Sequence, residues 1–285
     1  MAAKIQHALI TAAGPDARRL PLQSLNDRLG AWKPAIAIQI DEILAAGIGR
    51  VGVVIRPADR GAYESVLGGF GEVVTLIEQA EPAGYGHAVL CGRAFTQGAS
   101  FLLQVSDHLY VSAAERSCTR QLLEVAETEN CSVSAVQATP ENQLRYYGTV
   151  AASLLPGRKG IYQIDHVMEK PTPTLAEQTC VVPGLRSGHY LCFFGMHVLS
   201  PTVFSLLTAE QAANPAARLG LSPSLSALAA RETYLATELS GRRADLEAQF
   251  GVFRAQLALG LNGPARDEVL ALLAEELALD AVSRR

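Results

Sequence analysis

The sequence predicts an α/β protein with a mostly parallel or mixed central sheet and helices on both faces. Short apolar segments typical of buried strands alternate with segments whose apolar residues recur at helical spacing. This alternation favours right-handed crossovers between parallel strands. A chain of 285 residues with 49% hydrophobic residues is long enough to bury a sizeable core.

Strands and helices alternate regularly in the first half of the chain. Strands are expected at residues 7–12, 50–55, 73–77, 101–105 and 132–136, and helices at 34–46, around 62–67 and from 86 to 93. Ligands of such sheets bind outside the carboxyl ends of the strands. Three features at those ends are therefore expected to form one site: the loop at Gly14, the loop at 79–86, and Asp107.

The second half is less regular. Strands at 147–151 and 161–164, joined by a turn at 156–158, predict a hairpin, and residues 190–198 predict a long strand. Helices are expected at 225–230, 246–258 and 268–278, and a loop at 211–223. The apolar faces of the last helices are expected to pack on their own domain or to form an interface between copies of the chain.

Composition excludes several classes of protein. With 24 Lys+Arg against 28 Asp+Glu, the net charge of −4 argues against a nucleic-acid partner, which requires a basic face. No apolar run is long enough to span a membrane, and the first residues do not resemble a signal peptide. The five scattered cysteines indicate neither a disulfide framework nor a zinc site. The sequence therefore predicts a soluble, cytoplasmic protein.

The loop after the first strand has the residue types of a phosphate-binding loop. Gly14 allows backbone N–H groups to approach a phosphate, and Arg18 and Arg19 supply positive charge. The loop has neither a Walker motif nor the GxGxxG pattern. On its own it is equally well interpreted as a surface turn with two solvated arginines.

Carboxylates follow two other segments. Asp107 follows an apolar strand, where a parallel sheet can present a carboxylate to Mg²⁺, although such an Asp can also cap a helix. Asp245 can bind the same metal ion as Asp107, or it can be an N-cap or a solvated charge.

Glu169 and Lys170 precede Pro171. The proline predicts an extended backbone at Lys170, with the side chains of Glu169 and Lys170 on opposite sides of the strand. The alternative for this segment is an exposed turn.

A family resemblance rests on an ordered set of motifs. In chain order they are Ala13-Gly14, Arg18, Lys33-Pro34, Gln79, the GYGHAVL stretch at 84–90, Ser106-Asp107, Tyr147-Gly148, Glu169-Lys170-Pro171, Gly195 and Asp245. The set resembles the bacterial UTP–glucose-1-phosphate uridylyltransferases (UDP-glucose pyrophosphorylases), within the wider sugar-phosphate nucleotidyltransferases. The resemblance covers about residues 8–259, and GYGHAVL is its most specific part, because it closely matches that family's GLGHAVL.

The resemblance implies a fold and a reaction. The fold is Rossmann-like with a glycosyltransferase-A-like nucleotidyltransferase architecture. It implies one domain over residues 1–265, with a nucleotide-binding half at about 1–140 and a sugar-binding half at about 141–265, and a C-terminal helix at 266–285. The phosphate of a sugar 1-phosphate, most simply glucose 1-phosphate, attacks the α-phosphorus of UTP, and pyrophosphate leaves. Positioning and charge neutralisation suffice because the nucleophile is already an anion. A homo-oligomer is also expected.

The same resemblance implies a role for each matching residue. The implied roles are nucleotide binding by Ala13, Gly14, Gln79 and Gly84, catalysis by Arg18 and Lys170, sugar binding by Gly148, Glu169 and Gly195, and Mg²⁺ binding by Asp107 and Asp245.

The loop after the first strand departs from the family pattern GxGTRxxPxTKxxPKxxLP. Asp16 and Ala17 replace its second glycine and its threonine, and Leu25 stands where the catalytic lysine belongs. Arg19 and Arg28 are the candidates to supply the missing charge. The sequence thus leaves a second interpretation open: a catalytically impaired homologue that binds a nucleotide sugar and acts as a regulatory or partner subunit.

Overall fold

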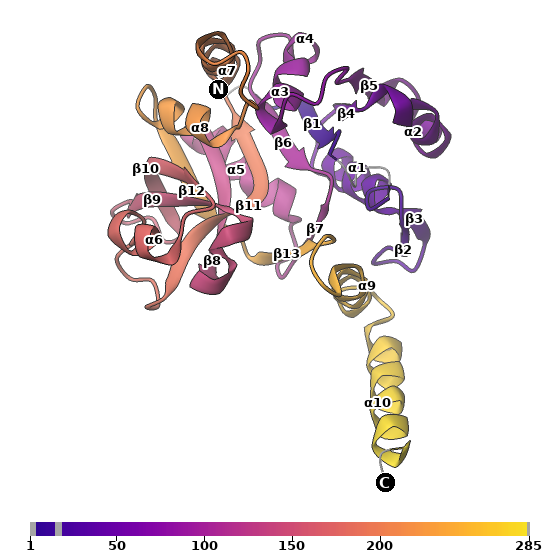
Figure 1. Cartoon of the computed structure of the whole chain (residues 1–285). Helices are drawn as coiled ribbons and strands as arrows, with labels where there is room; N and C mark the ends of the chain where they lie inside the picture. The colour runs from indigo at the N-terminus through magenta and orange to yellow at the C-terminus, as the bar shows by residue number, and fades with distance from the viewer. Residues whose placement is uncertain (1–3, 15–18, 284–285) are drawn as a thin grey trace.

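A nine-stranded mixed sheet forms the centre of the protein in a computed structural model that describes residues 4–14 and 19–283 (Figure 1). The strands lie in the order β5-β4-β1-β6-β11-β8-β12-β10-β9. In this order their bounds are Val74–Glu78, Arg50–Ile55, His7–Ala12, Phe101–Val105, His189–Leu199, Ser132–Pro140, Tyr234–Glu238, Ile161–Glu169 and Gly148–Leu154.

The first four strands of this order are parallel to one another. Alternate side chains of β1 enter different cores, with Ala8, Ile10 and Ala12 on one face of the sheet and Leu9 on the other. This alternation follows from the two-residue period of a strand. The helices that join these strands therefore cover both faces, as the sequence predicts.

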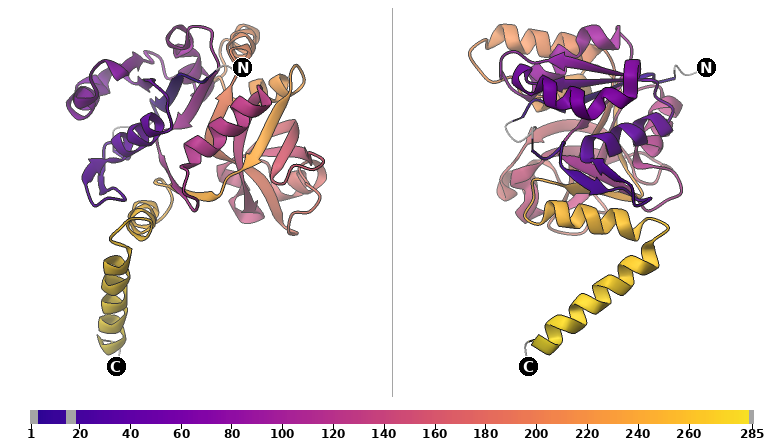
Figure 2. Two further views of the ribbon diagram at one scale, coloured as in Figure 1. Left: turned by 180° about the vertical axis from the view of Figure 1, so that it is seen from behind. Right: turned by 90° about the vertical axis from the view of Figure 1, so that its right-hand side faces the viewer.

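Each face of the sheet is covered by its own helices (Figure 2). One core contains apolar residues of α1 (Ala35–Ala45), α2 (Arg60–Leu67) and α5 (Cys118–Glu129). The other contains residues of α3 (Tyr85–Cys91), α7 (Thr202–Ala213) and α8 (Ser222–Ala229). The shorter helices are η1 (Pro57–Asp59), η2 (Gly68–Val73), α4 (Arg93–Thr96), η3 (Glu141–Tyr146) and α6 (Pro173–Thr179).

The rest of the sheet is mostly antiparallel. β11 is antiparallel to β6 and β8, β12 is parallel to β8, and β9 and β10 form the predicted hairpin. Two small sheets lie outside it, β7 (His108–Ser112) with β13 (Gly241–Asp245), and β2 (Ser24–Asn26) with β3 (Trp32–Pro34). The mixed form of the expected sheet is thus confirmed.

Several elements differ from the expectation. The sequence interpretation missed β7, β12, β13, α5 and α7, and the expected loop at 211–223 begins inside α7 and ends inside α8. The helix expected at 246–258 is α9 (Gly251–Leu261). It starts late because the carboxylate of Asp245 accepts the N–H groups of Glu247 and Ala248, which holds the chain in a turn.

The last two helices behave differently from each other. α9 contributes Ala255, Ala258 and Leu259 to a small core with β2, β7 and β13, whereas α10 (Arg266–Ser283) extends away from the body (Figure 2). Over residues 4–14 and 19–283, no helix is both long and apolar enough to cross a membrane. The domain boundaries expected near residues 140 and 265 stay predictions.

Candidate active site

Two predicted features lie side by side where parallel strands end. β1 ends at Ala12 and leads into Ala13 and Gly14, and β6 ends one residue before Ser106. The backbone N–H of Ser106 donates to the carbonyl of Thr11 at 3.3 Å, which joins the two strand ends. The other expected loop residues, Asp16, Ala17 and Arg18, lie outside the residues that the structure describes.

Asp107 lies where the chain leaves the main sheet at β6 and enters β7. Because a strand follows, Asp107 does not cap a helix. Its Oδ1 is 2.7 Å from Nδ1 of His108. Desolvation raises the pKa of Asp107, but His108 and the charge of Lys170 outweigh it, so that the pKa lies below its ordinary value. Asp107 is therefore an ionised carboxylate at neutral pH.

Asp245 approaches Asp107 from the end of β13. It pairs with His108 across the β7–β13 ladder, and the next residue, Leu246, donates its N–H to the carbonyl of Asp107 at 2.8 Å. The Tyr147 hydroxyl donates to Oδ2 of Asp245 at 3.2 Å. Two aspartates far apart in the sequence thus lie at neighbouring backbone positions, and their joint role in metal binding stays a prediction.

The pair has the donor chemistry of a magnesium site. Mg²⁺ prefers hard oxygen ligands, and it is commonly held by one or two carboxylates while keeping water and substrate phosphate oxygens. Among the described residues, no group of three or more His, Cys, Asp or Glu side chains could hold a metal ion. Asp107 and Asp245 supply the hard carboxylate oxygens that Mg²⁺ prefers, and the ion needs no more than one or two of them from the protein.

Gln79 and Gly84 also come together, next to the end of β5. The N–H of Gln79 donates to the carbonyl of Ile55 at 2.8 Å, which extends the pairing of β4 and β5. Its side-chain Nε2 donates to the carbonyl of Gly84 at 3.1 Å and lies 3.0 Å from Nδ1 of His87. The amide of Gln79 is thereby held in one orientation.

The glycines at the start of α3 allow a close backbone contact. Gly84 has a φ of +115°, and a Cβ there would lie 2.4 Å from the carbonyl oxygen of Leu219. A Cβ at Gly86 would lie 2.3 Å from the carbonyl oxygen of Gly220. Both distances are far below van der Waals contact, so only glycine fits at either position without a backbone shift.

Gly148 and Glu169 face each other as the last pair of the β9–β10 hairpin. A Cβ at Gly148 would lie 2.8 Å from the ring of Phe193 and 3.4 Å from Oε2 of Glu169. The same Oε2 accepts a hydrogen bond from Ser222 at 2.6 Å. The carboxylate of Glu169 is thus fixed beside Gly148, where a larger residue would meet both Glu169 and Phe193.

Gly195 lies where β11 bends between Phe193 and His197. Its φ is +91°, a left-handed conformation that favours glycine, and its carbonyl accepts the Tyr110 hydroxyl at 2.7 Å. The bend turns this part of β11 toward β7, which carries Tyr110.

The expected geometry of Lys170 is wrong. Its φ is +46° instead of extended, and its Nζ lies 3.9 Å from Oε1 of Glu169, so the two side chains approach each other. The strand ends at Glu169, and the chain turns sharply there before Pro171 instead of continuing straight. This turn brings the ammonium near enough to lower the pKa of Asp107.

Further contacts join these groups. The negative charges of Asp107 and Glu169 add to desolvation in raising the pKa of the Tyr85 hydroxyl. These interactions join residues from α3, from the end of β10 and from the turn after β6. Ala13 and Gly14 directly follow the end of β1, which a hydrogen bond joins to Ser106 beside Asp107.

Arg243 belongs to the same region, although the sequence interpretation gave it no role. Its guanidinium lies 3.7 Å from the ring centroid of Tyr147 and donates to the carbonyl of Phe193 at 2.5 Å. In β13, Arg243 and Asp245 are two residues apart and therefore share a face. That spacing is the signal that could have identified Arg243.

The position expected to hold the catalytic lysine is structural. Leu25 is only 3% exposed and pairs with Lys33 in the β2–β3 hairpin. The ammonium of Lys33 lies 2.6 Å from Asp41 and 3.4 Å from Asp27, so it is already held by two carboxylates. Neither Leu25 nor Lys33 therefore supplies the contact of the missing catalytic lysine.

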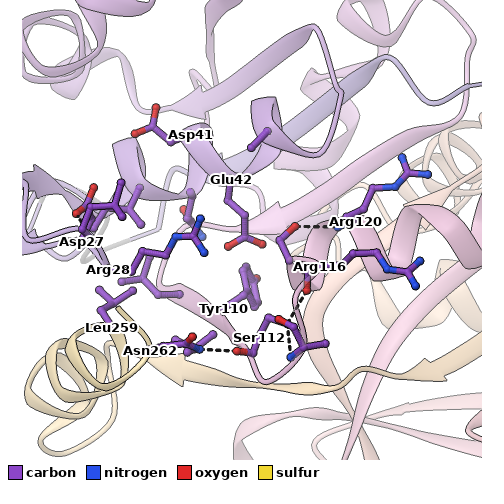
Figure 3. Close-up of a pocket in the computed structure, with 18 of the residues that line it drawn as sticks. Asp27, Arg28, Asp41, Glu42, Tyr110, Ser112, Arg116, Arg120, Leu259 and Asn262 are labelled. Atoms are coloured by element: carbon purple, nitrogen blue, oxygen red, sulfur yellow. Dashed lines mark hydrogen bonds between the residues drawn. The ribbon is translucent and has the colours of Figure 1, made fainter. Parts of the chain in front are cut away.

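Arg28 points into a separate cavity of about 640 Å³ beside α1 (Figure 3). Glu42 faces it, and Oε1 of Glu42 accepts a hydrogen bond from the Thr119 hydroxyl at 2.7 Å. Desolvation raises the pKa of Glu42 above its ordinary value. Asp107, Asp245, Glu169 and Lys170 do not line this cavity.

The mixed α/β fold of this chain is shared with solved UDP-glucose pyrophosphorylases. A solved UDP-glucose pyrophosphorylase from Acinetobacter baumannii has the same fold, with a TM-score of 0.75 at 21% identity, covering 96% of this chain and 99% of that one. A UDP-glucose pyrophosphorylase solved in complex with UDP-glucose matches with a TM-score of 0.72 at 22% identity, over 89% and 98% of the two chains.

Sequence comparison finds relatives that align over nearly the whole chain. The chain is 29% identical to the UTP–glucose-1-phosphate uridylyltransferase YngB of Bacillus subtilis, covering 96% of each chain. It is 27% identical to the UTP–glucose-1-phosphate uridylyltransferase of Streptococcus pyogenes, over 94% of this chain and 92% of the relative. No protein-family model matches the chain. The chain is thus similar over nearly its full length to UTP–glucose-1-phosphate uridylyltransferases, the family that the motifs resemble.

Proposed function

We propose that the chain is a Mg²⁺-dependent uridylyltransferase that forms UDP-glucose and pyrophosphate from UTP and glucose 1-phosphate. The observation that carries the proposal is the meeting of Asp107, Asp245, Glu169 and Lys170 at one place, in a chain that aligns with its uridylyltransferase relatives over almost its full length.

The nucleotide is proposed to bind along the ends of β1 and β5. The backbone at Ala13 and Gly14 contacts the phosphates, and Arg18 adds positive charge there. Nε2 of Gln79 is engaged by Gly84 and His87, so its amide oxygen is the group available to accept the imide N–H of uracil. The glycine at 84 lets this loop pack directly against the backbone of Leu219, beside the proposed place of the base.

The sugar phosphate is proposed to bind on the opposite side. The carboxylate of Glu169 accepts sugar hydroxyls, and the backbone at Gly148 and Gly195 lines the sugar. Lys170 holds the phosphate and aligns one of its oxygens with the α-phosphorus of UTP. The nucleophile is already an anion, so no side chain has to remove a proton. Positioning then supplies most of the rate enhancement.

Asp107 and Asp245 are proposed to hold the Mg²⁺ ion. When bound, the ion neutralises charge that develops on the phosphate oxygens as pyrophosphate leaves. The low pKa of Asp107 keeps its carboxylate ionised, and Tyr147 fixes the orientation of Asp245. Lys170 adds positive charge on the other side of the reacting phosphorus.

A pyrophosphate-release assay with UTP, glucose 1-phosphate and Mg²⁺ tests the proposal. Turnover is expected, and Asp107→Asn is expected to lower kcat by about 10²-fold or more, the loss typical when a group that stabilises transition-state charge is removed. Asp41→Asn removes a surface carboxylate and is the matched control, with kcat within about twofold of wild type. Replacing glucose 1-phosphate by galactose 1-phosphate tests the choice of sugar, and replacing UTP by TTP tests the choice of base.

The alternative is a homologue that binds a nucleotide sugar without turning it over. The relatives reported above are named as uridylyltransferases, which supports the active enzyme. Calorimetric binding of UDP-glucose together with no pyrophosphate release at saturating substrates would instead favour the regulatory or partner subunit.

We further propose that α10 mediates self-association. The helix carries exposed leucines on more than one side, with Leu272 56% and Leu277 72% exposed, and it extends from the body. We propose that another copy of the chain buries these leucines. Sedimentation is expected to give an oligomer for the wild type and a smaller species for Leu272→Glu with Leu277→Glu.

A cytoplasmic location is also proposed. All five cysteines are free thiols, which fits a reducing compartment.

A further inference from the structure

Gln39 makes an unusual pair of contacts from the middle of α1. Its side chain is buried, with a residue exposure of 3%. The amide Nε2 donates to the carbonyl of Val105 at 2.9 Å and to the carbonyl of His108 at 2.5 Å. One amide nitrogen thus joins two backbone positions that are three residues apart.

Those two carbonyls bracket the turn that carries Asp107. Val105 is the last residue of β6 and His108 is the first residue of β7, so only Ser106 and Asp107 lie between them. On the other side, Leu246 donates to the carbonyl of Asp107 at 2.8 Å. The backbone of the turn is therefore held by β13 from one side and by Gln39 from the other.

The orientation of the Gln39 amide is determined by its acceptors. Two carbonyl oxygens can be satisfied only by the NH₂ group, so the amide oxygen must point away from the turn. Within the described ranges, this buried Oε1 has no hydrogen-bond partner. An unpaired buried oxygen disfavours folding, so packing alone does not account for a glutamine here.

We propose that Gln39 is a positioning residue for the metal site, because it fixes the turn that presents the Asp107 carboxylate. This inference rests on the proposed function, in which Asp107 binds Mg²⁺. Gln39 itself does not touch metal or nucleotide. Its loss frees the carbonyls of Val105 and His108 to rotate, and the Asp107 carboxylate then samples orientations that do not match the ion.

Glu42 supplies a matched control on the same helix. It lies three residues after Gln39, and both line the cavity beside α1 (Figure 3). Its hydrogen bonds are with the backbone and hydroxyl of Thr119, away from the turn. Glu42→Gln therefore perturbs the same wall of the cavity without touching the support of Asp107.

The test measures metal binding directly, without turnover. Mn²⁺ is titrated into the full-length protein with UTP, and free Mn²⁺ is followed by electron paramagnetic resonance. Gln39→Met, which matches the size but has no donor, is expected to weaken Mn²⁺ binding about tenfold. Gln39→Glu is expected to weaken it more, because a carboxylate faces two carbonyl oxygens. Glu42→Gln is expected to stay within twofold of wild type.

Kinetics separate positioning from a structural effect. At saturating Mg²⁺, kcat of Gln39→Met is expected to recover to within threefold of wild type, while its half-saturating Mg²⁺ concentration rises about tenfold. A lowered kcat with an unchanged Mg²⁺ dependence would overturn the inference, as would wild-type Mn²⁺ binding by Gln39→Met. If Gln39→Met does not fold, the shorter amide of Gln39→Asn, which cannot reach both carbonyls, takes its place with the same expected loss.

Asp107→Asn distinguishes failure of this inference from failure of the proposed function. Loss of Mn²⁺ binding in Asp107→Asn with none in Gln39→Met rejects only the role of Gln39. Equal Mn²⁺ binding by the wild type and Asp107→Asn rejects the metal site itself, and with it both proposals.

Discussion

The proposed nucleotide side and the proposed sugar–metal side of the site are built in different ways. On the nucleotide side, Gly84 and Gly86 lie directly against the backbone of residues 219–220, and no side chain separates the two segments. On the sugar–metal side, charged groups are fixed by hydrogen bonds, as Ser222 fixes Glu169 and Tyr147 fixes Asp245. The first side depends on shape and the second on charge.

The two constructions predict different responses to substitution. A close backbone contact has no room to adjust, so adding one carbon atom is costly. A hydrogen-bonded carboxylate keeps its charge when a neighbour is removed and loses only part of its orientation. Substitutions on the nucleotide side should therefore affect folding, and those on the other side should affect ligand and metal binding.

The largest effect is expected for Gly86→Ala. The added Cβ would lie 2.3 Å from the carbonyl oxygen of Gly220, so the backbone must shift. The free energy of unfolding is expected to fall by about 3 kcal/mol, at the upper end of overpacking effects. Urea denaturation followed by circular dichroism measures it.

Gly61→Ala is the matched control for that substitution. Gly61 lies in α2, and a Cβ there meets open space. Because alanine is the better helix former, this variant is expected to be more stable than the wild type by about 0.5–1 kcal/mol. Equal effects of the two substitutions would contradict the steric account of the nucleotide side.

The second-largest effect is the loss of stability at low pH caused by a buried histidine in the central sheet. His197 in β11 is buried, and desolvation lowers its pKa from 6.5 to about 3. Between these values the unfolded chain binds a proton at this residue and the folded chain does not, so stability falls as the pH falls below 6.5. The free energy of unfolding should drop by about 2 kcal/mol from pH 6.5 to pH 4.5 through this residue alone.

Denaturation at several pH values measures that loss. His197→Gln, which cannot titrate, is expected to have a shallower dependence on pH by about that amount. His166→Gln alters an exposed histidine and serves as the control, with the wild-type slope. A slope in His197→Gln as steep as that of the wild type would show that other groups cause the acid sensitivity.

The smallest effect is expected for Tyr147→Phe on the sugar–metal side. The variant loses the 3.2 Å hydrogen bond to Asp245 and keeps the ring that Arg243 contacts. A loss of about 1 kcal/mol corresponds to about fivefold weaker binding of Mg²⁺, with little change in stability. Titration with Mn²⁺ and UTP measures it, and Tyr146→Phe at the exposed neighbouring residue provides the control. A loss of stability without weaker metal binding would reverse the expected contrast between the sides.

The sequence predicted best what depends on local pattern. Apolar runs identified the parallel strands, and the position of Asp107 at a strand end followed from one of them. The ends of β1 and β6 then had to lie together, because neighbouring parallel strands end at the same edge. Much of the site therefore follows from the order of strands and the residues at their ends.

What the sequence could not predict depends on contacts between distant segments. The short strands β7 and β13 are stabilised by pairing with each other, so neither has a strong pattern of its own. The left-handed backbone at Lys170 runs against the local rule for a residue before proline, and its surroundings determine it. Gln39 looks like an ordinary polar residue of a helix until the turn at Asp107 is placed against it.

Under the proposed self-association, the projecting C-terminal helix makes the state of the chain depend on its concentration. With 18 residues, α10 is about 27 Å long, and it packs mainly against α9, so it lacks much of the tertiary packing that usually stabilises a helix. By mass action, the fraction of chains in which α10 is folded then rises with the protein concentration. In dilute solution these residues should fray and be the first segment that a protease removes, whereas in concentrated solution they should be protected.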